Sequence, residues 1–248
     1  MKHIIHLIIL SSFFWGQDLG YFAGWPINDS KDEINDPGVT FECDENVNKK
    51  NAGCPCSSDA DCITGKCFRS PRIGNYCLQG KGTMFPRFKL IDQYGEEVDI
   101  YDFANQGKMI IIEFSTAWCK PCRELAAWLS YNDTSVTQSR MWKPEYDIIK
   151  DLVQQDQIYF INIQIQDIYK DSPSLDSVED WFQEYSDDKI PVLADSGYQV
   201  RDWMKITGYP TIILINERME IEQFSIRGWH DAFNFLSAMD WNFEKPAE

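Results

Sequence analysis

The sequence of 248 residues is poor in histidine and in positive charge. It has three histidines, and only His230 follows the last cysteine, Cys122. A zinc site that used Cys122 would need a second pair of cysteine or histidine ligands, and that pair is missing after it. With 23 basic and 39 acidic residues the net charge is −16, which disfavours nucleic acid and anionic membrane surfaces as partners.

Long hydrophobic runs are also scarce. The charged start and the apolar stretch at 4–15 have the length of a secretory signal and are shorter than a typical membrane span. We therefore expect residues 1–24 to be a signal-like segment. No clear cleavage site follows, so an uncleaved N-terminal anchor and a buried element are the alternatives. Residues 25–42 combine acids with proline and glycine, and they predict an acidic linker.

Six of the eight cysteines lie close together. Few large apolar residues accompany them, so this segment needs cross-links in order to fold. We predict a disulfide-rich module at 43–80 with three bridges in an oxidising compartment, and zinc is disfavoured because no histidine lies nearby. Several pairings remain open, except that two cysteines one residue apart should not pair with each other. The six residues are Cys43, Cys54, Cys56, Cys62, Cys67 and Cys77.

The remaining two cysteines belong to a WCKPC motif at 118–122, which follows the apolar run 109–114. Cysteines with this spacing at the first turn of a helix can close a short disulfide, and the helix N-terminus favours a thiolate at the first of them. Pro121 suits a first helical turn, where its missing N–H is not needed. The motif favours thiol–disulfide exchange with Cys119 as nucleophile and Cys122 as resolving thiol, over a structural disulfide or a zinc site.

A second motif is Tyr209-Pro210, which precedes a β-branched run at 211–215. Together with the WCKPC motif and the lead-in at 85–95, it makes residues 83–241 similar to thioredoxin-fold domains of the TlpA-like and AhpC/TSA (redoxin) kind. The resemblance implies a cis Pro210 packed against the active-site disulfide. It also implies that the Tyr209 backbone pairs with substrate. We interpret Trp118 as a packing lid against the sheet edge that also presents a surface to substrate, and thiol–disulfide exchange requires no cofactor or metal.

The pattern of apolar residues agrees with this resemblance. Strands and helices alternate along residues 83–248, which argues for an α/β thioredoxin-like fold with a central mixed sheet flanked by helices, preceded by the small disulfide-rich module. The expected strands are 88–91, 97–99, 109–115, 158–165, 191–194, 211–215 and 221–226, and the expected helices are 119–129, 144–155, 175–185, 200–206 and 231–241.

Glu113 lies in the middle of an apolar strand, where a carboxylate is costly unless it is paired or protonated. It is six residues before Cys119, where thioredoxins carry a buried aspartate. The functional interpretation is a proton acceptor for Cys122 with a pKa raised by burial. The structural interpretation is a residue that reaches the surface or a polar partner.

We therefore predict a secreted or periplasmic thiol–disulfide oxidoreductase that reduces disulfides of exported proteins. By the resemblance to TlpA-like proteins, its electron donor would be a membrane thiol relay. One alternative is a thiol peroxidase of the peroxiredoxin type, since Thr116 lies three residues before Cys119, although Ile112 replaces the proline of that family. The other alternative is a binding module on a thioredoxin scaffold, with the cysteine-rich segment as a spacer or docking element.

Overall fold

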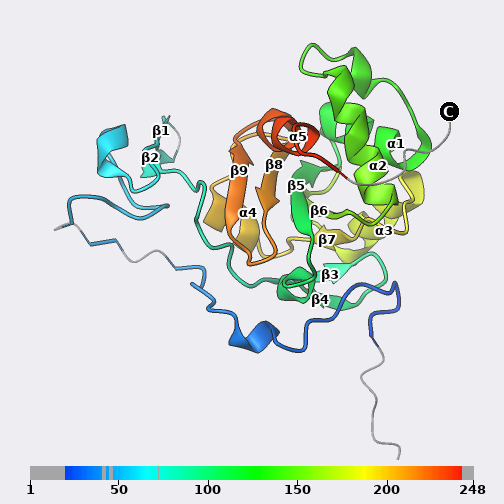
Figure 1. Cartoon of the computed structure of the whole chain (residues 1–248), viewed down its shortest axis with the longest axis horizontal. Coiled ribbons are helices and arrows are strands. Elements are labelled where there is room, and N and C mark those ends of the chain that lie inside the picture. Colours follow the sequence, from blue (N-terminus) through cyan, green and yellow to red (C-terminus); the bar gives the residue numbers. More distant parts are fainter. Residues whose placement is uncertain (1–19, 41–42, 45–46, 72, 242–248) are drawn as a thin grey trace, which may run out of the picture.

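The computed structural model describes residues 20–40, 43–44, 47–71 and 73–241 (Figure 1). Most of the expected signal-like segment, residues 1–19, therefore lies outside the described residues, and so does its alternative role as an anchor. Within the described part of the chain, no helix has both the length and the apolar character that a membrane span requires.

A seven-stranded sheet forms the centre of the main domain, with the strand order β4-β3-β7-β6-β5-β8-β9. The pairs β5–β6 and β6–β7 are parallel and the other pairs are antiparallel, so the sheet is mixed, as predicted. The strands are β3 (Lys89–Asp92), β4 (Glu97–Asp99), β5 (Met109–Thr116), β6 (Ile158–Gln166), β7 (Val192–Ala194), β8 (Thr211–Ile215) and β9 (Ile221–Ser225).

Helices cover both faces of this sheet, which confirms the predicted thioredoxin-like fold class. Side chains alternate along β5, so that Ile112 packs in the layer that contains Trp203 of α4, and Ile111 packs in the layer that contains Leu125 of α1 and Phe233 of α5. In the described residues the helices are α1 (Lys120–Tyr131), α2 (Ile148–Gln154), α3 (Leu175–Glu184), α4 (Gln199–Met204) and α5 (His230–Ser237), with 3-10 turns η1 (Lys31–Glu33), η2 (Asp59–Asp61), η3 (Ile100–Phe103), η4 (Val136–Gln138) and η5 (Pro144–Asp147).

The cysteine-rich segment contains three disulfides, as predicted, and the structure selects their pairing. The bridges are Cys43–Cys54, Cys56–Cys67 and Cys62–Cys77. The segment also forms two short strands that the sequence analysis did not predict, β1 (Cys67–Ser70) and β2 (Gly74–Cys77). The buried core of the module consists of four cysteine side chains, so its cross-links are also its packing.

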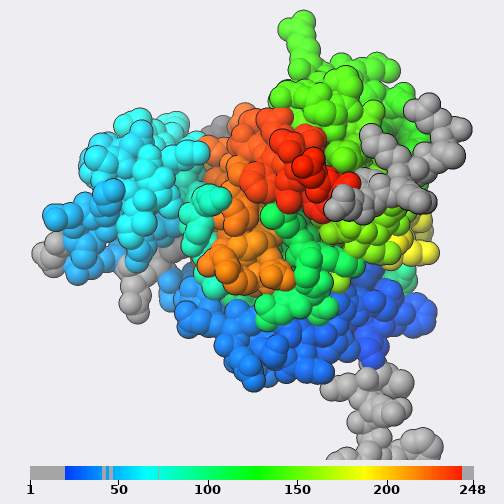
Figure 2. Space-filling model, viewed as in Figure 1, coloured from blue at the N-terminus to red at the C-terminus, as the bar shows by residue number. Residues whose placement is uncertain are grey.

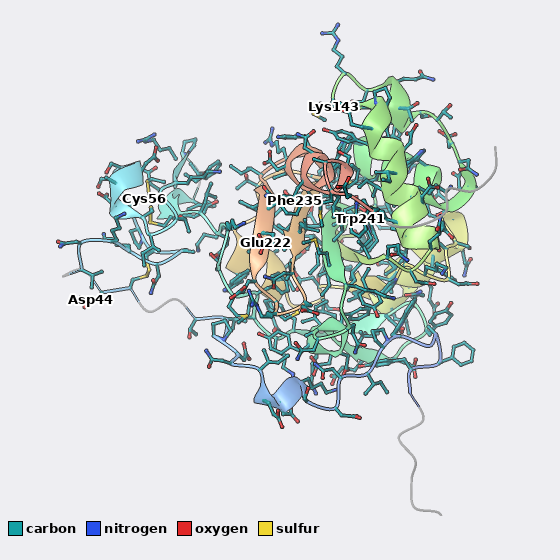
Figure 3. The ribbon with its side chains drawn as sticks, in the orientation of Figure 1. Asp44, Cys56, Lys143, Glu222, Phe235 and Trp241 are labelled. Atoms are coloured by element: carbon teal, nitrogen blue, oxygen red, sulfur yellow. A yellow bond between two sulfur atoms is a disulfide. The ribbon has the colours of Figure 1, made fainter. Side chains whose placement is uncertain are left out.

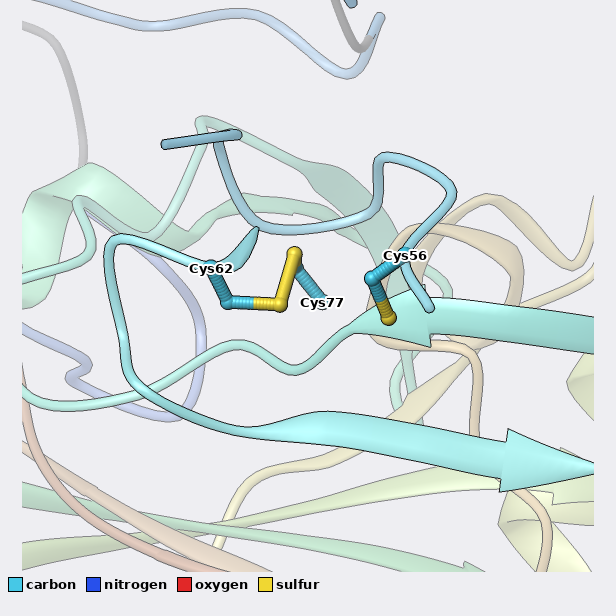
Figure 4. A group of neighbouring side chains, drawn as sticks. All are labelled: Cys56, Cys62 and Cys77. Atoms are coloured by element: carbon cyan, nitrogen blue, oxygen red, sulfur yellow. A yellow bond between two sulfur atoms is a disulfide. The ribbon is translucent and has the colours of Figure 1, made fainter. Parts of the chain in front are cut away.

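Three of these sulfur atoms lie close enough together to suggest a metal site. Those of Cys56, Cys62 and Cys77 are within 4.8 Å of one another (Figure 4). In the structure, however, each of them is bonded to another sulfur, and a disulfide sulfur is not the thiolate that a zinc ion binds. The close approach of these three sulfur atoms is therefore a consequence of the disulfide bonds.

The module connects to the main domain along β9. Its connecting residues pair with this edge strand through Gly82 N–H to Ile221 O at 2.8 Å and Ile221 N–H to Thr83 O at 2.9 Å. Lys81 also pairs with Glu222 at 2.7 Å, and Figure 3 shows Glu222 on β9, apart from Cys56 in the module. The connection therefore covers a strand edge that would otherwise be open to pairing with another chain.

Part of the expected acidic linker, 25–42, is packed against the main domain. Trp25 is buried and its indole N–H donates to Asp92 at 3.0 Å, while Lys31 pairs with the buried Asp102 at 2.6 Å. Tyr21, inside the expected signal-like segment, donates its O–H to Asp102 at 2.6 Å. Figure 2 shows this N-terminal segment lying along one side of the main domain.

Candidate redox site

The two cysteines of the WCKPC motif form a disulfide where β5 passes into α1. Cys119 is the N-cap residue of α1 and Pro121 lies in the first turn, as expected. The Cα atoms of Cys119 and Cys122 are 5.3 Å apart, and the Cys122 N–H points to the Cys119 sulfur at 3.3 Å. Cys119 is 4% exposed and Cys122 is fully buried. Both cysteines are therefore buried, and Cys119 is the one of the pair with any exposed surface.

The helix N-terminus is the main source of positive potential at Cys119. In the reduced protein the Cys122 N–H and the dipole of α1 would both stabilise a thiolate on the Cys119 sulfur. Lys120 contributes less, because its side chain is 85% exposed and is paired with Glu124 at 2.9 Å. The Cys119 sulfur thus lies at the helix N-terminus because of the local backbone geometry.

The Tyr209–Pro210 peptide bond is cis and lies at the start of β8. Tyr209 packs against the cluster that contains Cys119 and Cys122, and its ring meets the Trp118 ring edge-on at 5.8 Å. Burial raises the pKa of the Tyr209 phenol to about 12, so this group stays neutral. The structure therefore brings Trp118, Tyr209 and the disulfide together. The roles of Trp118, Tyr209 and Pro210 in substrate binding stay predictions.

Trp118 forms an exposed rim beside the disulfide. Its side chain is 38% exposed, and its indole N–H donates to Gln166 at the end of β6 at 3.2 Å. The Lys170 ammonium lies 5.2 Å from the ring centre. These two residues contact the indole from positions about 50 residues further along the chain, and the local sequence pattern did not identify either of them.

Glu113 is buried and lies within a polar network on β5 and β6. It is 1% exposed, one carboxylate oxygen accepts from the Asn162 amide at 2.9 Å, and the other has no hydrogen-bond partner in the described residues. Gln164 donates to Ser115 and to the Asn162 oxygen, both at 2.7 Å. Burial raises the pKa of Glu113 to about 8, and the Asn162 hydrogen bond lowers it less.

The position of Glu113 follows from alternation along β5. Glu113 shares a face with Ile111, and Ile111 packs in the same layer as Leu125, which is one turn of α1 after Cys122. The carboxylate therefore lies on the α1 side of the sheet, beneath the helix that carries Cys122. Its burial agrees with the functional interpretation, and its role as a proton acceptor stays a prediction. The sequence pattern did not single out Asn162 as the partner of Glu113, or Gln164 and Ser115 in the same polar network. The polar alternation at 158–165 was the signal for Asn162 and Gln164.

No family model matches the chain, and no curated protein matches it. Solved structures do match. They include a thiol:disulfide interchange protein from a Bacteroides species, with 21% identity, TM-score 0.44, and coverage of 64% of this chain and 88% of that one. The thioredoxin domain of a thiol-disulfide oxidoreductase from Bacteroides vulgatus has 22% identity, TM-score 0.42, and coverage of 63% and 94%. A peroxidoxin from Mycobacterium tuberculosis has 14% identity, TM-score 0.43, and coverage of 64% and 94%.

Similarities of this size carry no argument about activity. The strand order, the cysteine pair at the start of α1 and the proline at the start of β8 nevertheless define the class of the main domain from this chain alone. It is a thioredoxin-like domain that carries a CxxC disulfide.

Proposed function

We propose that this protein is a thiol–disulfide oxidoreductase that reduces disulfides of exported proteins. The observation that carries the proposal is the position of the Cys119 sulfur at the N-terminus of α1, with Cys122 buried one turn further on and the Tyr209–Pro210 loop packed against the pair. A thiolate at a helix N-terminus is both stabilised and placed for attack.

The cycle starts from the dithiol form. The Cys119 thiolate attacks one sulfur of a substrate disulfide, a mixed disulfide forms, and the other substrate sulfur leaves as a thiolate. Cys122 then loses its proton and attacks the Cys119 sulfur. The substrate leaves as its second thiolate, and the protein is left with the Cys119–Cys122 disulfide seen in the structure. Two electrons pass from protein to substrate, and an external dithiol must return them.

Glu113 is the proposed acceptor of the Cys122 proton. It is buried on the α1 side of the sheet, and its pKa of about 8 is near that of a thiol, so proton transfer between the two groups is close to balanced. The Asn162 amide holds the carboxylate in place at 2.9 Å.

The compartment and the electron donor are part of the proposal. Three disulfides in a small module are typical of secreted and periplasmic proteins, which supports a location outside the cytoplasm. In such a compartment a reductase needs a supply of electrons, so we propose a membrane thiol relay as donor and exported cysteine-containing proteins as substrates.

Single-cysteine variants test the chemistry. We expect Cys119→Ser to abolish insulin reduction, because no nucleophile remains, and Cys122→Ser to accumulate mixed disulfides with substrate, because release needs the second thiol. Lys120→Gln is the control variant and should keep most of the activity, since its charge is exposed and paired. Equal residual activity in the two cysteine variants would contradict the assigned roles.

The direction of electron flow is tested by the reduction potential of the Cys119–Cys122 couple, measured against glutathione. A value below about −200 mV supports a reductase, and a value near about −120 mV, as in a strong oxidant, would overturn the reductive direction.

A further inference from the structure

A cleft lies between the cysteine-rich module and the main domain. Its volume is about 800 Å³, which is within the range of ligand-binding pockets. One wall is β1 of the module with the turn after it, including Phe68 and Arg69. The other wall runs from α4 to the residues before β8, including Arg201, Lys205 and Tyr209.

The cleft is basic although the protein is acidic. Among the described residues that line it, the basic ones are Arg69, Arg201, Lys205 and Arg227, and the acidic one is Asp202. Asp202 is paired with Arg201 at 2.9 Å, so these two charges offset each other, and Arg69, Lys205 and Arg227 give the lining its net positive charge. A net positive lining on a chain of charge −16 is a local concentration of cations.

The module is attached to the main domain at this wall. The Tyr76 O–H donates to the Lys205 carbonyl at 3.0 Å, and the buried Gln79 side chain donates to the Trp203 carbonyl at 3.1 Å. Both acceptors are at the C-terminal end of α4, from which the chain passes directly to Tyr209. The module therefore has a defined position relative to the redox site.

The cleft borders the redox site at Tyr209. Tyr209 lines the cleft and also packs against the cluster that contains Cys119, so one end of the cleft lies next to the reactive disulfide. Arg227 lies across Gly208, where a Cβ atom would overlap its side chain. The absence of a side chain at Gly208 thus lets Arg227 lie beside the Tyr209–Pro210 loop.

A second hollow near the redox site has the opposite net charge. It is lined by Ala117, next to Trp118, and by residues of the β6–α3 connection and α3. Its charged residues are Arg123, Asp167, Asp176, Asp180 and Glu184. A substrate that crosses the disulfide therefore meets positive charge on the module side and negative charge on the α3 side.

We propose that the module and the Tyr209–Pro210 loop together bind an extended acidic segment of the substrate polypeptide, next to its target cysteine. This inference rests on the proposed function, since the occupant must also present a disulfide to Cys119. Arg69 and Arg227 are the specificity-determining residues, one from each side of the cleft. The cysteine-rich module then acts as half of a substrate-binding surface.

The test uses the full protein and three disulfide substrates. Two peptides are identical except that the residues outside their disulfide loop are glutamates or lysines, and the third substrate is the small neutral 2-hydroxyethyl disulfide. We expect kcat/KM for the acidic peptide to exceed that for the basic peptide about tenfold at low salt, with a smaller ratio at high salt. The overall charge of −16 would favour the basic peptide, so this preference can come only from local charge.

Two variants locate the effect. The double variant with Arg69→Gln and Arg227→Gln should lower the ratio of kcat/KM for the acidic peptide to kcat/KM for the basic peptide by about fivefold. A misfolded variant would instead lose activity toward both peptides. Arg218→Gln is the matched control, because Arg218 lies before β9, whereas Arg227 lies after this strand and lines the cleft. The Arg218→Gln variant should keep the wild-type ratio.

The outcomes separate this inference from the proposed function. If the wild-type protein does not reduce 2-hydroxyethyl disulfide, the proposed function fails and the cleft proposal fails with it. If it reduces this substrate but handles the two peptides equally, or if the double variant keeps the wild-type ratio, only the cleft proposal is overturned.

Discussion

The Glu113 carboxylate accepts a single hydrogen bond, from the Asn162 amide at 2.9 Å, and its second oxygen is buried with no hydrogen-bond partner in the described residues. A fully buried acid with one neutral donor is held in its protonated form over a wide pH range, because the charged form loses its hydration and gains little in return.

Glu113→Gln should alter the pH dependence of mixed-disulfide resolution. In the wild-type protein, resolution should accelerate with pH up to about 8, because Glu113 accepts the Cys122 proton only when it is ionised. The variant should resolve the mixed disulfide more slowly than the wild type between pH 7 and 9. Near pH 5 the two rates should be similar, because the wild-type Glu113 is then protonated and cannot accept a proton. Rapid-quench trapping of the mixed disulfide measures this step, with the exposed Glu97→Gln as control. Superimposable profiles for the wild type and Glu113→Gln would exclude the catalytic role.

Glu113→Gln should also change how stability depends on pH. The pKa of Glu113 is about 8 in the folded protein and near its ordinary value of 4.5 in the unfolded chain. Between these values the folded state binds the extra proton, so the free energy of unfolding falls as pH rises through this window, by at most about 1.4 kcal/mol per pH unit. The variant should lack this fall. Urea unfolding at pH 5, 7 and 8.5 compares the two, and parallel curves would show that Glu113 titrates normally.

Removal of the Cys62–Cys77 bridge should unfold the module and leave the main domain folded. The core of the module consists of cysteines, and a bridge with a sequence separation of 15 contributes about 3 kcal/mol. Cys62→Ser with Cys77→Ser should therefore become sensitive to protease within 43–80. Tryptophan fluorescence is an internal control, since residues 43–80 contain no tryptophan. A lower fluorescence midpoint would mean that the two parts unfold together.

Asp102→Asn should detach the N-terminal segment from the main domain. The buried Asp102 carboxylate accepts hydrogen bonds from the Tyr21 O–H at 2.6 Å and the Asn28 N–H at 2.9 Å, and it pairs with Lys31 at 2.6 Å. Loss of the charge should cost about 2 kcal/mol, because Lys31 then lacks its partner. Asp32→Asn is the matched control at an exposed ion pair with Arg87 and should be near neutral in urea unfolding. Equal effects of the two changes would contradict a special role for Asp102.

Local residue patterns were sufficient to predict the fold class and the cysteine pair that forms a disulfide at the start of α1. A strand, a CxxC motif with proline in the first helical turn, and a proline before a β-branched run are short-range features, and each is set by backbone preferences within a few residues. The cysteine clustering likewise predicted a module with three bridges, because a segment with so little apolar surface cannot fold without them.

The residue patterns alone therefore predicted the cysteine pair of the main domain and the kind of fold that holds it. What surrounds this pair depends on the folded structure: the pairing of the six module cysteines, the Asn162, Gln164 and Ser115 side chains near Glu113, and the placement of Arg69 and Arg227 along one cleft. These contacts join residues far apart in the chain. Their geometry depends on strand register and on how the module docks against α4, and neither leaves a periodic signal in the sequence.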